Sequence, residues 1–118
     1  CAPRPLQLGA ARALLDGEDW LAHARQVYAR AAKSAAEALG LPVPSGGSFL
    51  FFVAGPYLKR GESMPEFLLR VLEGGVMLTP GSAAGRDYER WVRLCFTSVP
   101  QAELDAALER LCSVLRNP

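Results

Sequence analysis

The sequence predicts an α/β protein of two layers (α+β), in which a small three-stranded sheet, mixed or antiparallel, packs against helices. Helical periodicities alternate along the chain with short runs typical of strands. The 118 residues, 50% of them hydrophobic, suffice for one core but not for two ordinary domains. Two predicted strands, 76–79 and 90–97, have no helix between them, so they can pair as an antiparallel hairpin with a long loop.

Two helices are predicted first. Residues 3–15 begin with two prolines and continue as a short apolar helical run, which the Asp16-Gly17 turn pair ends. From Glu18 onward, apolar residues recur at spacings of three and four, which predicts a long helix over 18–39. Gly40 stands in the usual position after its C-terminus.

A strand and a third helix follow. Residues 48–53 are apolar on both alternating faces and rich in residues that favour strands, so we expect a strand covered on both sides. Ser63 and Glu66 have the spacing of a capping box, which predicts the start of a helix over about 64–73.

The last third of the chain predicts two strands and a closing helix. The short apolar run 76–79 stops at a Pro-Gly pair, and a polar loop covers 80–89. In 90–97, Val, Leu and Phe alternate with Trp, Arg, Cys and Thr, as in a strand with two different faces. A second capping-box spacing, Ser98 to Gln101, precedes the apolar stripe of the final helix.

Charge and hydropathy exclude several classes of protein. Thirteen basic and twelve acidic residues leave a formal charge of +1, which does not support a general binder of nucleic acid or anionic membranes. The longest strongly apolar stretch, Phe49 to Ala54, is far too short to span a bilayer, and no signal-peptide pattern is present.

The three cysteines, at positions 1, 95 and 112, have neither zinc-site spacing nor the density of a disulfide scaffold. We therefore expect a reducing compartment, the cytoplasm. The sequence starts with Cys1 and enters a helical pattern within a few residues, so we expect it to be a piece of a longer protein.

Arg93 is the most suggestive candidate for a binding site, because it interrupts the β-rich run WVRLCF. A guanidinium held there is always charged and can grip a carboxylate through two hydrogen bonds. The alternative is an arginine on the solvated face of a half-buried strand. Trp91 and Cys95, on the same predicted face, weaken that alternative because a solvated face is usually more polar.

Other reactive side chains have simpler interpretations. His23 has no metal-ligand set near it in the sequence and is expected at the surface. Cys95 and Cys112 lie in apolar patterns without an adjacent base, so we expect buried structural thiols. Lys33 and Lys59 have charged neighbours and are expected to be solvated, and the glycine-bearing loops match no phosphate-binding fingerprint.

Four stretches in fixed order carry a family resemblance: PxPLQ at 3–7, PSGGSFLFF at 44–52, GGVMLTPGSAAG at 74–85 and WVRLCFT at 91–97. This series resembles the C-terminal part, or small domain, of class I/II aminotransferases, the fold type I enzymes that use pyridoxal 5'-phosphate. The resemblance covers essentially the whole chain.

The resemblance implies roles for individual residues. Arg93 matches the arginine that binds the substrate's α-carboxylate. Phe49 matches a residue near the substrate's side chain, with Gly47 giving backbone room beside it. The Pro80-Gly81 pair matches a turn at the mouth of the site, where a purely structural role is equally compatible.

The resemblance also implies a division of labour. Residues 1–17 match the end of the large-domain helix or a linker, and 18–118 match the small domain. The lysine that bonds the cofactor, its acidic partner and the phosphate-binding cup belong to the large domain in this family, upstream of the matched region. The implied function is amino transfer between an amino acid and a 2-oxo acid by a homodimeric enzyme, with this chain alone inactive and carrying no cofactor-binding or metal residue.

Two other functions remain open at this stage. One is a non-catalytic α/β binding or regulatory module, in which Arg93 contacts a small carboxylate or nothing. The other is the aminotransferase-like domain of a transcriptional regulator, which an N-terminal DNA-binding segment would distinguish.

Overall fold

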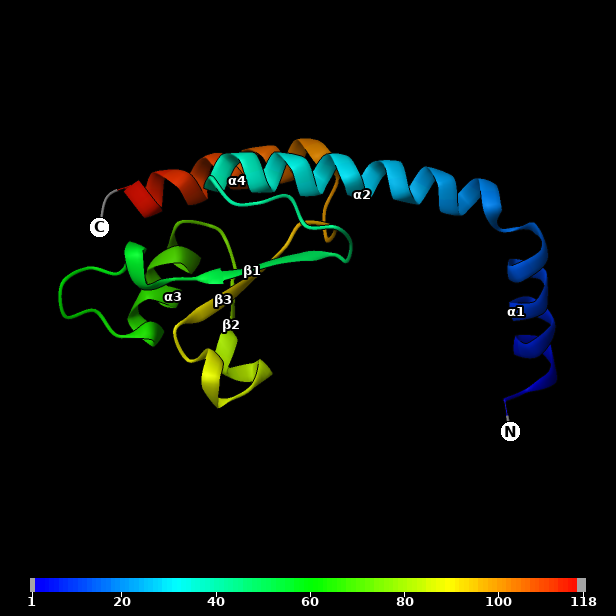
Figure 1. Cartoon of the computed structure of the whole chain (residues 1–118), viewed down its shortest axis with the longest axis horizontal. Helices are drawn as coiled ribbons and strands as arrows, with labels where there is room; N and C mark the ends of the chain where they lie inside the picture. The colour runs from blue at the N-terminus through cyan, green and yellow to red at the C-terminus, as the bar shows by residue number, and fades with distance from the viewer. Residues whose placement is uncertain (1, 117–118) are drawn as a thin grey trace.

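The computed structural model describes residues 2–116, so Cys1 and the last two residues lie outside the described part. Helices precede, separate and follow three short strands (Figure 1). The elements in chain order are α1 (Arg4–Asp16), α2 (Glu18–Leu39), β1 (Phe49–Val53), η1 (Gly55–Tyr57), α3 (Met64–Glu73), β2 (Thr79–Pro80), η2 (Gly81–Ala84), η3 (Arg86–Tyr88), β3 (Trp91–Cys95) and α4 (Gln101–Arg116).

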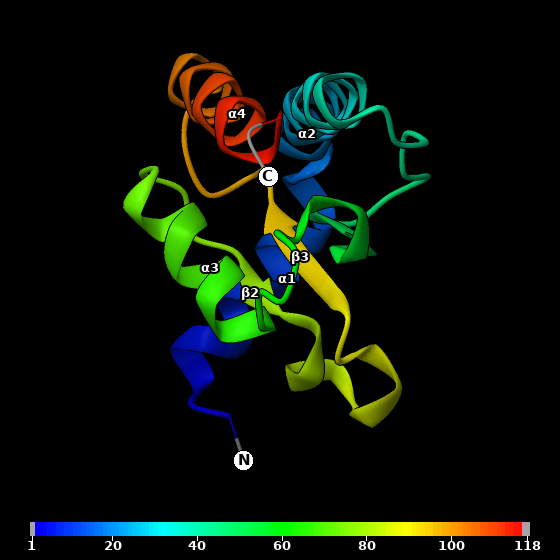
Figure 2. The same cartoon turned by 90° about the vertical axis from the view of Figure 1, so that its left-hand side faces the viewer.

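The three strands form one antiparallel sheet in the order β1-β3-β2. The last strand in the sequence is therefore the central one. The two-layer α/β prediction is confirmed, and of the two sheet types left open the antiparallel one is observed. Helices α2 and α4 run side by side in the same direction above the sheet, and α3 packs beside α4 (Figures 1 and 2).

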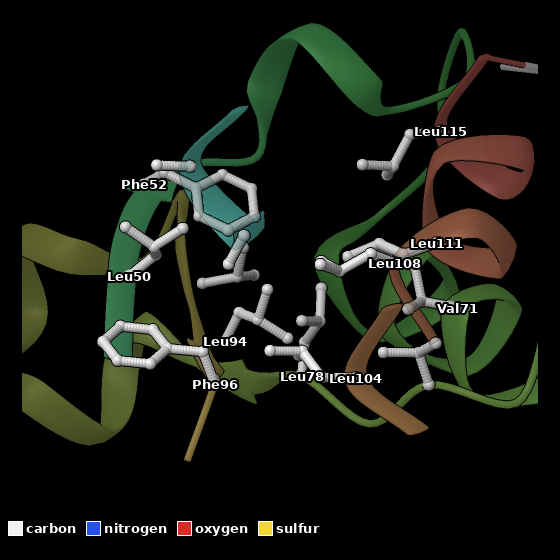
Figure 3. Close-up of a cluster of buried hydrophobic side chains, with 14 of the residues drawn as sticks. Leu50, Phe52, Val71, Leu78, Leu94, Phe96, Leu104, Leu108, Leu111 and Leu115 are labelled. Carbon is white, nitrogen blue, oxygen red and sulfur yellow. The ribbon is translucent and has the colours of Figure 1, made fainter. Parts of the chain in front are cut away.

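The core lies between the sheet and α2, α3 and α4 (Figure 3). The buried residues of α2 are all alanines, which let its backbone approach the core closely, whereas those of α4 are leucines at spacings of three and four. The buried side chains are Ala31, Ala32, Ala35, Ala36, Leu50, Phe52, Ala54, Phe67, Val71, Val76, Leu78, Val92, Leu94, Phe96, Leu104, Leu108, Leu111 and Leu115.

Helix α1 and the first half of α2 extend away from this core (Figure 1). No residue of α1 is buried, and the apolar side chains of Leu14 and Trp20 are 88% and 68% exposed. The radius of gyration is 17.6 Å, against about 13.5 Å for a compact domain of this length. Part of the apolar surface of this chain is thus left uncovered by residues 2–116.

The strand predicted over 48–53 was expected to be covered on both sides, and this expectation is wrong for the described chain. Leu50 and Phe52 are buried, but Phe49 and Val53 on the other face are 44% and 41% exposed. All three packing helices lie over the same face of the sheet. The sequence pattern shows that both faces are apolar, but it does not show whether a layer covers each of them.

The predicted strand 76–79 is shorter than expected, because only Thr79 and Pro80 pair with β3. Val76 and Leu78 still insert into the core, while Met77 between them is 79% exposed. Residues 76–78 therefore alternate between buried and exposed side chains, as in a strand, but do not pair with a neighbouring strand. The following loop, 80–89, contains the 3-10 turns η2 and η3.

Candidate functional site

Arg93 lies in the middle of the central strand, on the face of the sheet opposite the core. Strand alternation buries Val92 and Leu94 and turns Trp91, Arg93 and Cys95 outward. The sequence predicted this division of β3 into two faces, and the structure confirms it. The Arg93 side chain is therefore directed to the outward face of the sheet, away from the core.

Few groups of the protein engage the Arg93 guanidinium. Its Nη2 donates a hydrogen bond to Thr79 Oγ1 at 3.4 Å, and its central carbon lies 5.1 Å from the centroid of the Phe49 ring. Within residues 2–116 no carboxylate forms an ion pair with it. Most of its N–H donors are thus available to an external acceptor.

An aromatic cluster fills the neighbouring part of this face. The Phe51 ring stacks on Trp91 with centroids 5.1 Å apart and meets the edge of Tyr88 at 5.2 Å. Phe51 is the residue directly opposite Arg93 on β1. The Arg93 guanidinium lies over the ring of Phe49, the next outward-facing residue of β1.

Two hollows border Arg93. The smaller, of about 90 Å³, is lined by Phe51, Thr79, Pro80, Ala83, Ala84 and Arg93 itself. The larger, of about 510 Å³, includes Met77 and Cys95 and the charged side chains of Glu103 and Arg110. A planar guanidinium at the edge of such hollows can bind a carboxylate through two parallel hydrogen bonds.

The turn after β2 shapes the smaller hollow. Gly81 is buried, and a Cβ added there would meet the carbonyl oxygens of Tyr88 and Trp91, the latter at 2.5 Å. A larger residue would have to displace the backbone of the loop 80–89. The structural role that the sequence left open for the Pro80-Gly81 pair therefore has a physical basis, and its role at a site mouth stays a prediction.

Cys95 and Cys112 were expected to be buried, and the structure corrects this for both. Cys112 is half-buried and donates from Sγ to the Ala38 carbonyl oxygen at 3.3 Å. Cys95 is exposed because it falls on the outward phase of β3, which no helix covers. Partial burial raises the pKa of its thiol, but hydrogen bonds with Thr97 and the positive charge of Arg93 outweigh this and leave the pKa below its usual value.

Gly47 is not brought to Arg93 in the way Phe49 is. It is exposed with φ +85°, and a Cβ added to it would meet nothing within 4 Å. It lines a separate hollow of about 290 Å³ together with Arg25 and Tyr28 of α2. The glycine is therefore explained by its backbone conformation rather than by a close neighbour, and its role beside a substrate stays a prediction.

The lysines do not form a cofactor site in this chain. Lys33 is exposed on α2, 3.8 Å from Glu37, and Lys59 is exposed in the loop before α3. Neither borders the hollows at Arg93. A lysine that forms an imine with pyridoxal phosphate needs a desolvated setting, which neither Lys33 nor Lys59 has.

Residues 2–116 contain neither a metal centre nor a membrane-spanning helix. No group of three or more His, Cys, Asp or Glu side chains is placed to hold a metal ion there, and His23 is exposed as predicted. In the same part of the chain, no helix combines the length and the apolar composition that crossing a bilayer requires.

Two neighbours of Arg93, Thr79 and Phe51, were not identified from the sequence, nor was Tyr88, which packs on Phe51. Thr79 and Phe51 are the residues opposite Arg93 in the two ladders, so they depend on strand order and register. Tyr88 comes from the loop 80–89, whose path the polar pattern does not reveal. The only available signal was the Thr-Pro-Gly sequence, which places Thr79 at the end of a strand.

The comparisons with known proteins agree on one family. The family model described as "Aminotransferase class I and II" matches residues 1–111. An aspartate aminotransferase of Pyrococcus abyssi is 34% identical over 98% of this chain and 31% of its own length. An aromatic-amino-acid aminotransferase 2 of Thermococcus litoralis is 33% identical over the same shares. The chain thus spans about a third of the length of these relatives.

Solved structures share the fold. An aromatic aminotransferase of Pyrococcus horikoshii has a TM-score of 0.71 and 31% identity, covering 91% of this chain and 30% of that one. LysN, an α-aminoadipate aminotransferase of Thermus thermophilus complexed with N-(5'-phosphopyridoxyl)-L-leucine, has a TM-score of 0.69 and 27% identity, covering 87% and 28%.

Proposed function

This chain belongs to the class I and II aminotransferases, and from that premise we propose that it is the C-terminal part of a pyridoxal-phosphate-dependent transaminase in which Arg93 binds the substrate's α-carboxylate. The reaction is amino transfer between an amino acid and a 2-oxo acid. Both substrates carry a carboxylate next to the reacting carbon, so one guanidinium serves both.

The observation that carries this proposal is the open guanidinium of Arg93. It stands on the uncovered face of the sheet, with one hydrogen bond to Thr79 and one ring contact to Phe49. A charged group of this kind without a carboxylate partner among residues 2–116 is suited to a carboxylate that arrives as ligand. Phe49, 44% exposed beside it, would contact the substrate's side chain. Gly47, which in this chain lines a separate hollow, would give backbone room at the start of the same strand.

The rest of the enzyme would cover the surfaces that this chain leaves open. We assign residues 1–17 to the end of the large domain and 18–118 to the small domain, since α1 contributes nothing to the core. The large domain would supply the lysine and the phosphate-binding groups, and a second copy would complete a homodimer. The free thiols of Cys95 and Cys112 fit a cytoplasmic enzyme of amino acid metabolism.

The test is Arg93→Ala in the full-length enzyme, with Arg60→Ala as the matched control in an exposed loop. Losing a charge-assisted pair with a carboxylate should lower kcat/KM by about 100-fold or more for both the amino acid and the 2-oxo acid. The Arg60→Ala control should remain within about twofold of the parent enzyme, because exposed surface changes are usually small. Unchanged kinetics in Arg93→Ala would remove this residue from the site.

The isolated chain should be inactive, since its lysines are exposed and do not line the hollows at Arg93. Titration of this chain with pyridoxal phosphate, followed by visible absorbance, should give no saturable signal of covalent attachment to a lysine. A specific, saturable signal would contradict the assignment of the cofactor to the upstream domain. Such a signal would also contradict the prediction that this chain alone is inactive.

A further inference from the structure

Thr79 stands directly opposite Arg93 in the β2–β3 ladder. Directly paired residues of antiparallel strands project from the same face of the sheet, with their Cβ atoms about 5 Å apart. The Thr79 hydroxyl is the only side-chain group within residues 2–116 that accepts a hydrogen bond from this guanidinium, at 3.4 Å. This hydrogen bond therefore influences the orientation of the Arg93 guanidinium.

The local sequence holds this hydroxyl in place. Pro80 restricts Thr79 to extended backbone, and the β-branched threonine side chain has few χ1 rotamers. Gly81 then lets the chain pass close to the backbone of Trp91, which anchors the end of β2 against β3. The acceptor is thus positioned before any ligand binds.

We propose that Thr79 is a positioning residue for Arg93, an inference that rests on the proposed carboxylate-binding function. The guanidinium carbon lies over the Phe49 ring, 5.1 Å from its centroid, and Nη2 donates a hydrogen bond to the Thr79 hydroxyl. Arginine is among the side chains that lose most rotamer freedom when ordered. Because these two contacts form before the ligand binds, less side-chain conformational entropy is lost when the carboxylate binds. The N–H groups that remain free are then available to the carboxylate.

The experiment compares Thr79→Val and Thr79→Ser in the full-length enzyme. Valine keeps the shape but lacks the acceptor, so KM for both the amino acid and the 2-oxo acid should rise about threefold to tenfold. The value of kcat should stay within about twofold, because saturating substrate orders the guanidinium itself. Serine keeps the hydroxyl and should return KM to within about twofold of the parent. Thr79→Ala should reproduce the valine effect if the hydroxyl is the cause.

A double-mutant cycle with Arg93→Ala separates positioning from a general structural effect. In the Arg93→Ala background, Thr79→Val should change kcat/KM by less than about twofold, because the group that it positions is gone. An equal loss in both backgrounds would overturn the positioning role, as would an unchanged KM in Thr79→Val. If Arg93→Ala itself leaves the kinetics unchanged, the carboxylate-binding function fails and this inference fails with it. If only the threonine variants behave like the parent, Arg93 keeps its role and Thr79 loses its own.

Discussion

Two arginines of this chain lie over phenylalanine rings, yet they stand in opposite situations. The guanidinium carbon of Arg70 is 5.3 Å from the Phe67 centroid, and that of Arg93 is 5.1 Å from the Phe49 centroid. The residue types and the ring distances are nearly the same. The two arginines differ in the number of hydrogen-bond acceptors that the fold supplies and in how far the arginine is buried.

Most N–H donors of Arg70 are engaged by the protein. Its Nε and Nη2 bind the two carboxylate oxygens of Glu62 at 2.7 and 2.8 Å, and Nη1 and Nη2 also donate to the carbonyl oxygens of Val114 and Tyr57, both at 2.9 Å. The Arg70 and Glu62 side chains are only 17% and 9% exposed. This arginine joins the loop before α3 to the last turns of α4.

Arg93 has one hydrogen bond, at the longer distance of 3.4 Å, and is exposed. The comparison shows that an arginine within an apolar helix or strand pattern is not, on that ground alone, a ligand-binding residue. An arginine whose donors are mostly used inside the fold serves stability, and one whose donors face an open hollow can serve a ligand.

The largest expected effect on stability comes from replacing Arg70, the arginine whose hydrogen bonds are made inside the fold. Arg70→Met in the full-length protein leaves the Glu62 carboxylate in a mostly buried position and two carbonyl oxygens without their donor. Breaking a buried pair in this way should lower the free energy of unfolding by about 3 kcal/mol. Denaturant unfolding followed by circular dichroism measures the change.

The control for that variant is Arg93→Met, which removes the same side chain from the open site. Among residues 2–116 it loses one long hydrogen bond and one exposed ring contact, so the free energy of unfolding should change by no more than about 0.5 kcal/mol. A similar destabilisation by both substitutions would break the distinction between the two arginines.

A smaller effect is the loss of stability at low pH through the Glu62–Arg70 pair. The hydrogen bond from Arg70 lowers the pKa of Glu62 from 4.5 to about 2, against the opposing influence of burial. Since the folded pKa is below the unfolded one, this pair stabilises the fold fully above pH 4.5 and loses its contribution as the pH falls toward 2. After allowance for solvent screening, the contribution is about 2 kcal/mol.

Glu62→Gln should therefore be less stable than the parent at neutral pH, and the difference should shrink as the pH falls through this window. Thermal unfolding at a series of pH values measures it. Glu73→Gln, an exposed carboxylate at the C-terminal end of the nearby helix α3, is the control and should follow the parent curve. A constant gap between Glu62→Gln and the parent at every pH would show that the charge of Glu62 is not the source of the stability.

The sequence predicted the elements well because their signals are local. The capping box of Ser63 and Glu66 is present, with Glu66 accepting from the Ser63 backbone N–H at 2.8 Å. Helix α2 has the predicted bounds, and Gly40 after it adopts the left-handed conformation with φ +65°. Capping, glycine conformation and helical periodicity depend on residues within a few positions of one another.

The errors came from interactions between distant segments. The outer face of β1 and the thiol of Cys95 were expected to be covered, and both are open because all the packing helices lie over the other face. The partners of Arg70 are up to 44 positions away in the sequence, and no local pattern indicated them.

The amino-acid sequence by itself determined the order of the elements, the one core, the two faces of β3 and the family resemblance, since periodicity and motif spacing are written along the chain. Only the tertiary structure decided that β3 is the central strand and that Thr79, Phe49 and Phe51 surround Arg93. The physical reason is that strand order and register are set by the packing of β1, β2 and β3 with the helices. The same packing leaves the Arg93 guanidinium open while Arg70 is enclosed.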